Sequence, residues 1–500
     1  MRVLYITSEV FPFAKTGGLA DVSASLPGAL KELGIDVRLL VPGYRQALER
    51  APNLKQIYRG DDPLGTGEFR VLESYLPRTD VPVWFIDAPQ LYDRSGGLYQ
   101  NESGEDWPDN ALRFALLNHV AAAIVTEPGI GWRPELVHCH DWHAGLLPLL
   151  LGASGKPRPA TLFTIHNLAY QGLFPSEELA RLRLPHHAFA SMEFYGRISF
   201  LKAGIQASDA LTTVSPTYAK EIRTSEYGCG FDGLLRERAS VLTGILNGVD
   251  YQVWDPATDT HLTANYSARS IARKTDCKRA VQTSLGLDVG ADAPLLAFLS
   301  RLVHQKMPDV VLDVLPQFLE QGAQFVLVAE GDDGYQTCFR ELAAQYPGQV
   351  SIQGYDEELA HRVLAGADMV LHPSRFEPCG LVPIYGMRYG TVPLVRNSGG
   401  MADTVVDATP DAVRQGTATG FSFDEPTAAA LADCIDRAIA LYRQPIAWRR
   451  LQACGMRQDF SWRRSGKAYA ELYQKLTGAP AVRARTKAAK TEAALSKLTA

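Results

Sequence analysis

Residues 2–41 read RVLYITSEVFPFAKTGGLADVSASLPGALKELGIDVRLLV, and this stretch contains the start of a βαβ unit. The apolar runs at residues 2–7 and 36–41 have the composition of short strands. Between them, residues 19–33 place apolar side chains at near-helical spacing, directly after a pair of glycines. A strand, a glycine turn, a helix and a second strand in this order favour a doubly wound α/β fold.

Strand-like runs, separated by segments long enough for crossover helices, continue along the chain. Within the first helix, Pro27 lacks the N–H group that a helix interior uses, so we expect a kink or a split there. Alternation of strands and helices is typical of parallel sheets covered by helices on both faces. Further strands are predicted at residues 83–86, 136–138, 161–164, 210–214, 295–299, 324–328, 350–352, 369–371 and 392–395.

The predicted strands fall into two groups, which indicates two domains. We expect both to be doubly wound and Rossmann-like, facing each other across a deep cleft. Between the groups the pattern weakens into polar turns such as Asp255-Pro256, as in a hinge. The predicted organisation is an N-terminal domain at 1–250, a hinge or linker region at 251–292, a C-terminal domain at 293–460, a C-terminal helix at 461–478 and a disordered tail at 479–500.

The composition is that of an ordinary globular protein. Of the 500 residues, 46% are apolar and 21% are charged, which is enough to bury the cores of two or three domains. A net charge of -5 gives no reason to expect a nucleic-acid partner. Seven cysteines without a CxxC pair favour reduced thiols over a disulfide framework. The chain opens without a signal-peptide pattern and has no long uncharged apolar window, so we expect a cytoplasmic protein that does not enter a membrane.

A carboxylate in the second half, Glu377, stands where open α/β sheets bind ligands. The sequence SRFEPCGL, residues 374–381, leaves the apolar run at 367–372 and enters a predicted helix. The N-terminus of that helix, just beyond Gly380, is suited to an anion because its first N–H groups have no partner inside the helix. Glu377 is then placed to bind a neutral polar substrate beside the anion.

Cations follow predicted strands in both halves. Arg301 and Lys306, in SRLVHQK, suit a diphosphate because arginine offers a planar fork of donors and lysine a mobile point charge. A solvated basic loop is an equally weighted alternative for these two residues alone. Lys15 precedes the turn Gly17-Gly18, whose backbone N–H groups can approach a ligand closely. This turn has neither the GxGxxG spacing of a dinucleotide fold nor a P-loop pattern.

Histidines gather at the ends of two predicted strands of the first half. In HCHDWH, residues 138–143, His140 and His143 are three apart, but an HExxH pattern and a second ligand pair are missing. We therefore favour hydrogen-bonded histidines, with Asp141 at a strand exit, over a metal site. His166 leaves the next strand on the same rim. Polar strand exits in both halves favour one shared cleft.

Nine stretches together resemble the bacterial glycogen synthases and plant starch synthases, which are glycosyltransferases of the GT-B architecture. They follow one another in the family's order over residues 1 to about 478. The lysine-glycine-glycine start and the RFEPCGL stretch are similar to those of the branch that uses ADP-glucose. The stretches are KTGGLADV (15–22), HCHDWHAG (138–145), FTIHNLAYQG (163–172), SFLKAG (199–204), TVSPTYAKEI (213–222), GILNGVD (244–250), SRLVHQK (300–306), SRFEPCGL (374–381) and NSGGMADTV (397–405).

The resemblance implies transfer of glucose from ADP-glucose to the non-reducing end of an α-1,4-glucan, with retention of configuration. The partners it implies are ADP-glucose and glycogen or a maltooligosaccharide, with no metal ion or other cofactor, no nucleic acid and no membrane. It implies catalytic roles for Glu377, His166, Arg301, Lys306 and Asp141. Among these, Glu377 is expected to bind a glucose hydroxyl rather than to act as a nucleophile.

The resemblance also implies a set of donor-binding residues. Tyr355 is similar to the family position that stacks on adenine, and the C-terminal helix at 461–478 is expected to pack back toward the first domain. The full donor-binding set is Lys15, Gly17, Gly18, Asn247, Arg301, Lys306, Tyr355, Cys379, Gly380, Leu381 and Val382.

The chain departs from the family's usual sequence near the diphosphate. Val382 and Pro383 stand where a polar pair is common, so phosphate binding there rests on the N–H groups of Leu381 and Val382. His304, Met307, Pro308 and the turn at 329–332 also differ. We expect these departures to affect donor affinity and nucleotide preference rather than the reaction class.

Three alternatives remain from the sequence. A GT-B glucosyltransferase that uses UDP-glucose or another acceptor shares the cation loop and the acidic stretch. A nicotinamide-dependent oxidoreductase has doubly wound domains but needs a glycine fingerprint that the first turn lacks. A glycan-binding protein without catalysis does not need Arg301, Lys306 and Glu377 together.

Overall fold

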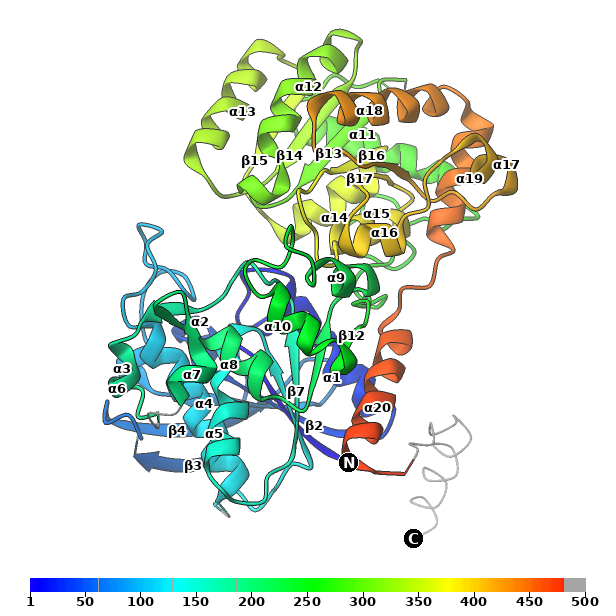
Figure 1. The fold of residues 1–500 in the computed structure, drawn as a ribbon. Helices are drawn as coiled ribbons and strands as arrows, with labels where there is room; N and C mark the ends of the chain where they lie inside the picture. Colours follow the sequence, from blue (N-terminus) through cyan, green and yellow to red (C-terminus); the bar gives the residue numbers. More distant parts are fainter. Residues whose placement is uncertain (62, 128, 185–187, 291, 481–500) are drawn as a thin grey trace. The chain divides into compact units, whose positions relative to one another are not determined.

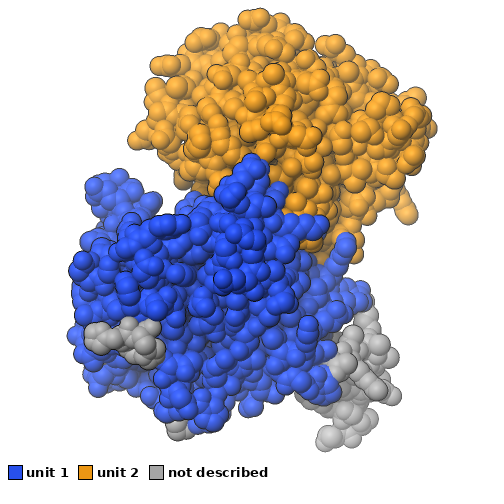
Figure 2. Space-filling view, in the orientation of Figure 1, with its two compact units in different colours: residues 1–214, 219–248, 462–500 blue, residues 215–218, 249–461 orange. Residues whose placement is uncertain are grey.

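The computed structural model describes residues 1–61, 63–127, 129–184, 188–290 and 292–480 (Figure 1). The chain divides into two compact units, which Figure 2 colours separately. The predicted tail at 479–500 lies outside the described residues from position 481 onward. Unit 1 contains residues 1–214, 219–248 and the C-terminal segment from 462, and unit 2 contains residues 215–218 and 249–461.

Unit 1 is built on a sheet of nine described strands in the order β12-β11-β7-β6-β1-β2-β5-β4-β3. All neighbours from β12 to β5 pair in parallel, and β4 and β3 continue the sheet in antiparallel pairing. Val3 of the central strand pairs with Val37 on one side and Leu136 on the other. The strands are β1 (Arg2–Ile6), β2 (Asp36–Pro42), β3 (Lys55–Asp61), β4 (Glu68–Tyr75), β5 (Pro82–Asp87), β6 (Leu136–His140), β7 (Ala160–Ile165), β11 (Ala210–Thr213) and β12 (Leu242–Gly244).

The first helix, α1 (Gly18–Glu32), begins directly after the glycine turn and buries Leu19, Leu26 and Leu30. It runs unbroken through Pro27, so the predicted split at this proline is wrong. Pro27 is itself buried, and the helix packs against β2 and α20. Burial of this apolar face outweighs the single hydrogen bond that the proline cannot donate.

Helices and a small second sheet complete unit 1. The second sheet is antiparallel and contains β8 (Leu173–Pro175), β10 (Arg197–Ser199) and β9 (Glu193–Phe194) in that order. It lies within the connection from β7 to α8. The remaining helices are α2 (Arg45–Arg50), α3 (Pro89–Tyr92), α4 (Asn110–Thr126), η1 (Trp142–Ala144), α5 (Leu146–Ala153), α6 (Glu178–Arg181), α7 (Ala188–Met192), α8 (Phe200–Ala207), α9 (Pro216–Glu221, whose first residues belong to unit 2), α10 (Asp232–Glu237), η2 (Ala239–Val241) and α20 (Trp462–Thr477).

The last described helix, α20, belongs to unit 1, where it packs on α1 and β6. Ser465 donates a hydrogen bond of 2.5 Å to the carbonyl oxygen of Leu246. Tyr473 meets a ring nitrogen of His138 at 2.7 Å. The contact with α1 is tight, because a Cβ added to Gly466 would lie 3.2 Å from Ala29.

Unit 2 contains a parallel sheet of six described strands in the order β15-β14-β13-β16-β17-β18. Its strands are β13 (Leu295–Leu299), β14 (Gln324–Val328), β15 (Val350–Gln353), β16 (Met369–His372), β17 (Val392–Arg396) and β18 (Phe421–Phe423). Its helices are η3 (Ile271–Arg273), α11 (Lys274–Ser284), η4 (His304–Lys306), α12 (Pro308–Glu320), α13 (Asp333–Gln345), α14 (Glu357–Gly366), α15 (Leu381–Arg388), α16 (Gly399–Thr404), α17 (Pro410–Gln415), α18 (Ala428–Tyr442) and α19 (Pro445–Met456).

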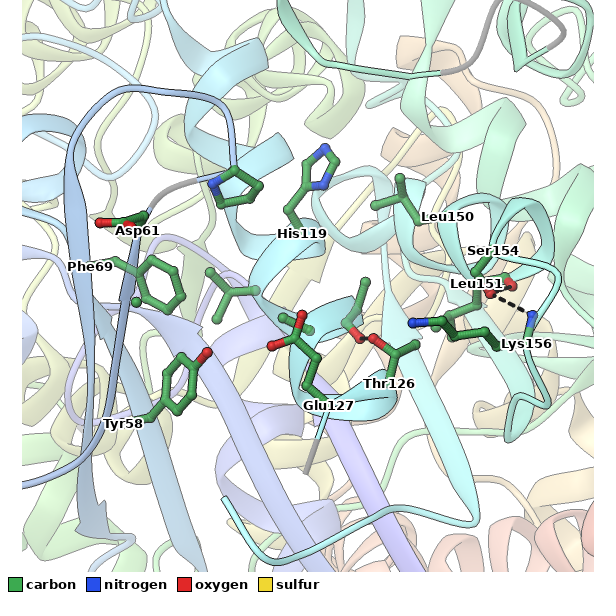
Figure 3. A pocket seen from close by; sticks show the side chains of 15 residues that line it. Tyr58, Asp61, Phe69, His119, Thr126, Glu127, Leu150, Leu151, Ser154 and Lys156 are labelled. Carbon is green, nitrogen blue, oxygen red and sulfur yellow. Dashed lines mark hydrogen bonds between the residues drawn. The ribbon is translucent and has the colours of Figure 1, made fainter. Parts of the chain in front are cut away.

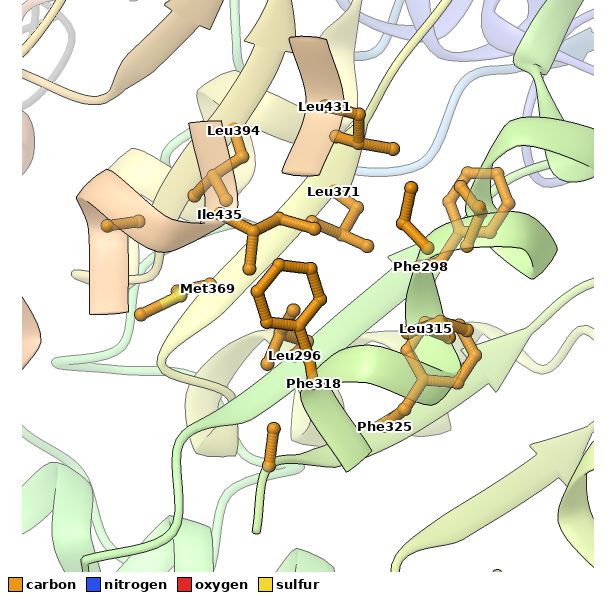
Figure 4. Packing of buried hydrophobic residues seen from close by; sticks show 14 of the residues in the cluster. Leu296, Phe298, Leu315, Phe318, Phe325, Met369, Leu371, Leu394, Leu431 and Ile435 are labelled. Carbon is orange, nitrogen blue, oxygen red and sulfur yellow. The ribbon is translucent and has the colours of Figure 1, made fainter. Parts of the chain in front are cut away.

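Each face of this sheet has its own apolar core. On β13, Leu296 and Phe298 join a core with α12 and α18, part of which Figure 4 shows. Leu295, Ala297 and Leu299 of the same strand join a second core with α14 and α15. Successive side chains of a strand point to opposite faces, so a strand that is apolar at every position belongs in a sheet covered on both sides.

The segment at 251–292, predicted as a hinge or linker, is assigned to unit 2. The ring of Trp254 stacks between those of His361 and Tyr385, with centroid distances of 3.8 and 4.1 Å. Asp259 binds His361 Nδ1 at 2.7 Å. A hinge action of this segment stays a prediction.

Candidate active site

Glu377 of unit 2 lies in the loop between β16 and α15, at the carboxyl end of the sheet. Its side chain is 8% exposed, and one oxygen, Oε2, makes three contacts. Lys306 Nζ forms an ion pair with this oxygen, His372 Nε2 lies 2.8 Å from it, and Ser374 Oγ donates to it at 2.9 Å. Lys306 follows β13, the neighbour of β16 in the sheet. The structure therefore brings together a predicted cation and the predicted carboxylate at one edge.

The surrounding charges keep Glu377 ionised. Burial by itself would raise the pKa of Glu377, but the Lys306 ammonium and His372 outweigh it and hold the pKa well below its usual range. Burial, followed by the nearby Lys306 charge, lowers the pKa of His372. A neutral His372 beside an ionised carboxylate donates through Nε2, which leaves its Nδ1 unprotonated. That Nδ1 has no hydrogen-bond partner in the described structure.

Besides the Lys306–Glu377 contact, hydrogen bonds at His304 and Gln305 tie the loop that carries Lys306 to the loop after β16. Arg375 donates its backbone N–H to Gln305 O at 2.8 Å, and Gln305 Nε2 donates to Phe376 O at 2.9 Å. Arg375 Nη1 donates to His304 O at 2.7 Å. Because these bonds cross between the two loops, the position of Lys306 is set by the same segment that positions the carboxylate.

The turn after Lys306 is made by Met307. Met307 has φ 56° and ψ 42°, in the left-handed region, and is fully buried. Pro308 follows as the first residue of α12, where a proline lacks only an N–H group that the helix would leave unpaired. Arg301, at the start of the same loop, is exposed.

The start of α15 is packed closely against α16. Gly380 precedes α15 with φ 73°, and a Cβ added there would lie 2.1 Å from Met401 Cε. A Cβ on Gly400 would lie 2.2 Å from the carbonyl oxygen of Cys379. Both glycines are therefore required for the close approach of the two segments.

The first turn of α15 holds the donor-binding residues predicted there. Leu381 and Val382 are its first two residues, both half-buried, and their N–H groups lie at the positive end of the helix dipole. Pro383, the third residue, has no N–H group to offer. Tyr355 follows β15, is 47% exposed and donates its hydroxyl to Glu357 Oε2 at 2.5 Å.

In unit 1, Asp141 follows β6 and has φ 54°, an uncommon backbone conformation for aspartate. Its Oδ1 accepts hydrogen bonds from the backbone N–H groups of His166, at 2.7 Å, and Asn167, at 3.4 Å. Burial raises the pKa of Asp141 to about 7, against the lowering effect of these two N–H groups. Burial lowers the pKa of His166 to about 3. The two predicted residues therefore lie together.

The neighbouring histidines are buried and in contact with one another. His140 Nδ1 lies 2.9 Å from His166 Nε2, and Tyr5 stacks on the His140 ring at 3.9 Å. His143 lies between the rings of Trp142 and Tyr99, at 3.9 and 4.7 Å. Within the described ranges, no group of three or more His, Cys, Asp or Glu has the arrangement of a metal site.

The glycine turn before α1 is organised by Glu9, which the sequence analysis did not single out. Glu9 Oε2 accepts from the backbone N–H groups of Thr16, at 2.7 Å, and Gly17, at 3.1 Å. Its Oε1 accepts from the Thr16 hydroxyl at 2.6 Å and from the Tyr99 hydroxyl at 2.7 Å. Two N–H groups of the predicted anion-binding turn thus already bind a carboxylate of the chain. Gly18 follows as the first residue of α1.

The other predicted residues of unit 1 lie nearby in sequence but have different surroundings. Lys15 Nζ lies 3.1 Å from Asp21 Oδ1 and 5.2 Å from the centroid of the Phe11 ring. Asn247 is 5% exposed, and its Oδ1 has no partner among the residues that the structure describes. The glycine after Asn247 packs against the backbone of Trp462 at the start of α20.

Sequence reasoning found one central pair in each unit, Asp141 with His166 and Lys306 with Glu377. It missed Glu9. This glutamate lies two residues beyond the strand predicted at 2–7, and a polar residue just after a strand is the pattern that identified Asp141 and Glu377. It also missed the contact of His372 with the carboxylate. The roles of all the predicted residues stay predictions.

A pocket of about 310 Å³ lies elsewhere in unit 1 (Figure 3). Its wall comes from β3, β4, α4 and α5, with Tyr58, Phe69 and His119 among the lining residues. None of the residues predicted for the active site lines it. In the described part of the chain, no helix is long and apolar enough to cross a membrane.

Comparisons with known proteins find relatives over almost the whole chain. The family model of the starch synthase catalytic domain matches residues 2–237, and that of glycosyl transferases group 1 matches residues 287–450. A glycogen synthase of Paramagnetospirillum magneticum is 50% identical over 484 residues, which cover 96% of this chain and 98% of that protein. One of Thioalkalivibrio sulfidiphilus is 50% identical over 482 residues, covering 95% and 100%. The solved catalytic domain of starch synthase IV from Arabidopsis thaliana, bound to ADP and acarbose, matches with a TM-score of 0.87 at 31% identity, covering 95% of this chain and 99% of that one.

Proposed function

Because the chain belongs to the family of glycogen and starch synthases, we propose that it transfers glucose from ADP-glucose to the non-reducing end of an α-1,4-glucan with retention of configuration. Glycogen synthase activity is the general function that these relatives support over the whole chain. The ADP bound to the related starch synthase supports an adenine nucleotide as the donor. The observation that carries the proposal is the buried Lys306–Glu377 pair beside the N-terminus of α15.

In the proposed step, the bond between the glucose C1 and the diphosphate oxygen breaks, and its electron pair leaves with ADP. The acceptor's 4-hydroxyl oxygen bonds to C1 on the same face, and its proton passes to the departing phosphate oxygen. Negative charge therefore grows on the diphosphate while C1 becomes electron-poor. Stabilising the leaving diphosphate is the main demand on the protein.

The charges suited to the diphosphate are Lys306, Arg301 and the first N–H groups of α15, with Lys15 as a further cation from unit 1. A preorganised donor of this kind contributes roughly 2.7–4 kcal/mol to lowering a barrier. Glu377 makes its contacts with Lys306 through Oε2, so Oε1 is the oxygen suited to a glucose hydroxyl. An ionised carboxylate held in this way orients the sugar rather than attacking it. We propose that no metal ion or other cofactor takes part.

Asp141 and His166 are proposed to bind the transferred glucose from unit 1. A carboxyl group with a pKa near 7 can both donate and accept a hydrogen bond, which suits a sugar hydroxyl. His166, whose pKa is far below neutrality, is a neutral partner. Asn247 is proposed to contact the same substrate through its buried side-chain oxygen.

To test this proposal, the purified protein is incubated with glycogen and with either ADP-glucose or UDP-glucose labelled in the sugar. Each incubation is run with and without EDTA. Label in the polymer from ADP-glucose, unaffected by EDTA, is the expected result. Label from UDP-glucose alone would support the alternative donor, and no label from either would contradict the proposal. Release of the label by an enzyme specific for α-1,4 bonds then tests retention.

A further inference from the structure

The connection from β7 to α8 contains a hairpin whose tip is Tyr195. In this hairpin Phe194 pairs with Arg197, so Tyr195 and Gly196 form a two-residue turn. Their φ angles are 50° and 79°, and positive values at both positions are typical of a type I′ turn. Asparagine or glycine is preferred at the first position, and a bulky aromatic residue there is strained. A strained residue that the turn does not need is a candidate for a functional role.

The Tyr195 side chain packs against Phe194 and is otherwise exposed to solvent. It is 81% exposed, the highest value among the large apolar side chains of the described residues. Its ring meets Phe194 edge-on at 4.8 Å, and Phe194 stacks on Phe231 at 4.3 Å. A Cβ added to Gly230 would lie 2.9 Å from Phe194 and 3.3 Å from Tyr195, so backbone supports both rings. An aromatic ring that protein contacts hold in place, while most of its surface stays exposed, is preorganised for a ligand.

The hairpin lies at the same edge of the unit 1 sheet as the predicted glucose-binding pair. The connection that carries it starts at the carboxyl end of β7, where His166 lies, and returns to α8. Its small sheet contacts η1, the short helix after β6, through the rings of Phe174 and Trp142, whose centroids lie 5.7 Å apart. Trp142 directly follows Asp141. The hairpin thus belongs to the connection after β7, and Asp141 follows β6, its parallel neighbour in the sheet.

We propose that Tyr195 forms a subsite for the acceptor glucan, at a distance from the point of transfer. A glucose ring has an apolar face of C–H groups bordered by hydroxyls, and tyrosine offers an apolar ring face with a hydroxyl at its end. Each glucose unit of a long chain presents the same face, so the contact suits a polymer. The subsite rests on the proposed transfer to an α-1,4-glucan.

The decisive variant is Tyr195→Asn, because asparagine suits the turn and removes the ring. It is expected to leave the melting temperature unchanged or higher. The KM for glycogen should rise at least fivefold, while the KM for ADP-glucose and the kcat at saturating glycogen stay within twofold. Tyr195→Phe keeps the ring face and should stay within threefold of wild type in all three. Tyr75→Asn, at an exposed tyrosine on β4, is the control and should leave the KM for glycogen unchanged.

A second measurement does not depend on transfer. Electrophoresis through a native gel that contains glycogen should retard the wild type more than Tyr195→Asn. If the wild type is retarded through Tyr195 but transfers no glucose, the subsite stands and the proposed reaction fails. If Tyr195→Asn keeps the wild-type KM for glycogen and the wild-type retardation, the subsite is wrong even though transfer stands.

Discussion

His138 on β6 and Tyr473 on α20 are joined by a hydrogen bond of 2.7 Å between imidazole Nδ1 and the phenol oxygen, across 335 positions of the sequence. Both side chains are fully buried, and burial lowers the pKa of His138 well below its usual value. The other ring nitrogen meets Thr164 Oγ1 at 2.6 Å. Both ring nitrogens of the neutral His138 are therefore hydrogen-bonded, one to Tyr473 and one to Thr164. These bonds fix the position of α20 on the sheet of unit 1.

Tyr473→Phe should lower the free energy of unfolding of unit 1 by about 1–3 kcal/mol, because a buried ring nitrogen of His138 loses its partner. Urea denaturation followed by tryptophan fluorescence measures the change. Tyr75→Phe removes the hydroxyl of an exposed tyrosine and should change stability little. Equal effects of the two substitutions would contradict the role given to the buried bond.

Lys306→Ala and Glu377→Ala should each lower kcat at least tenfold without unfolding the protein. The first removes a cation from the leaving diphosphate, and the second removes the carboxylate that orients the sugar. Steady-state rates with ADP-glucose and glycogen, beside circular dichroism spectra, give the comparison. Lys55→Ala, at an exposed lysine on β3, is the matched control. A variant at either site with a near-normal rate would place the active centre elsewhere.

Gly380→Ala should destabilise unit 2 by about 2 kcal/mol or more, because the backbone has φ 73° and the new methyl group meets Met401. Thermal unfolding of Gly354→Ala provides the comparison, since nothing lies within 4 Å of a Cβ there. Gly380→Ala is also expected to raise the KM for ADP-glucose. Two variants with the same melting temperature would show that the loop tolerates a side chain.

Val382→Thr should lower the KM for ADP-glucose several-fold. The second residue of α15 is half-buried and lies where phosphate oxygens meet helix N–H groups in the proposed complex, and threonine adds a hydroxyl donor there. Initial rates over a range of donor concentrations measure the effect. An unchanged KM would mean that this position does not face the diphosphate.

The stability of unit 2 should rise with pH above neutrality because of Lys274. This side chain is buried, and Nζ donates to two carbonyl oxygens and to the Thr391 hydroxyl, at 2.7 to 3.1 Å. Burial lowers its pKa from 10.5 to about 7, with Asp368 opposing the shift. Between these values the unfolded chain binds the extra proton, so the free energy of unfolding increases with pH.

Lys274→Met removes this titration. From pH 7 to pH 9 the wild type should gain about 2 kcal/mol of unfolding free energy relative to the variant. Urea denaturation of both proteins at the two pH values gives the difference, in which other titrating groups cancel. Parallel pH profiles would show that Lys274 stays protonated in the folded state.

Much of the fold could be predicted because the central strands are apolar at nearly every position. The strands at 295–299 and 324–328 agree with β13 and β14, and the two α/β units confirm the GT-B fold class. β3 and β4 were missed because they lie at a sheet edge, where exposed charged residues dilute the apolar signal. The break at Pro27 was wrong because tertiary packing, which no local pattern contains, stabilises the helix.

For the candidate site, too, some residues could be predicted from the sequence and others could not. Strand exits pointed to Asp141, His166, Lys306 and Glu377, since the carboxyl ends of parallel strands meet at one edge. Glu9 was not recognised because its function depends on which N–H groups a turn presents, and that follows from the fold. The predicted cleft and the meeting of residues from the two units stay predictions.

The chain leaves unit 1 at residue 248 and returns to it at 462, and this order has a consequence for synthesis on the ribosome. All of unit 2 emerges before α20 does, so unit 2 can fold while unit 1 still lacks its final helix. Until α20 docks, His138 is without its phenol partner and the α1 surface around Ala29 is uncovered. The first half of the nascent chain therefore keeps apolar surface exposed until synthesis of unit 2 is complete and α20 covers that surface.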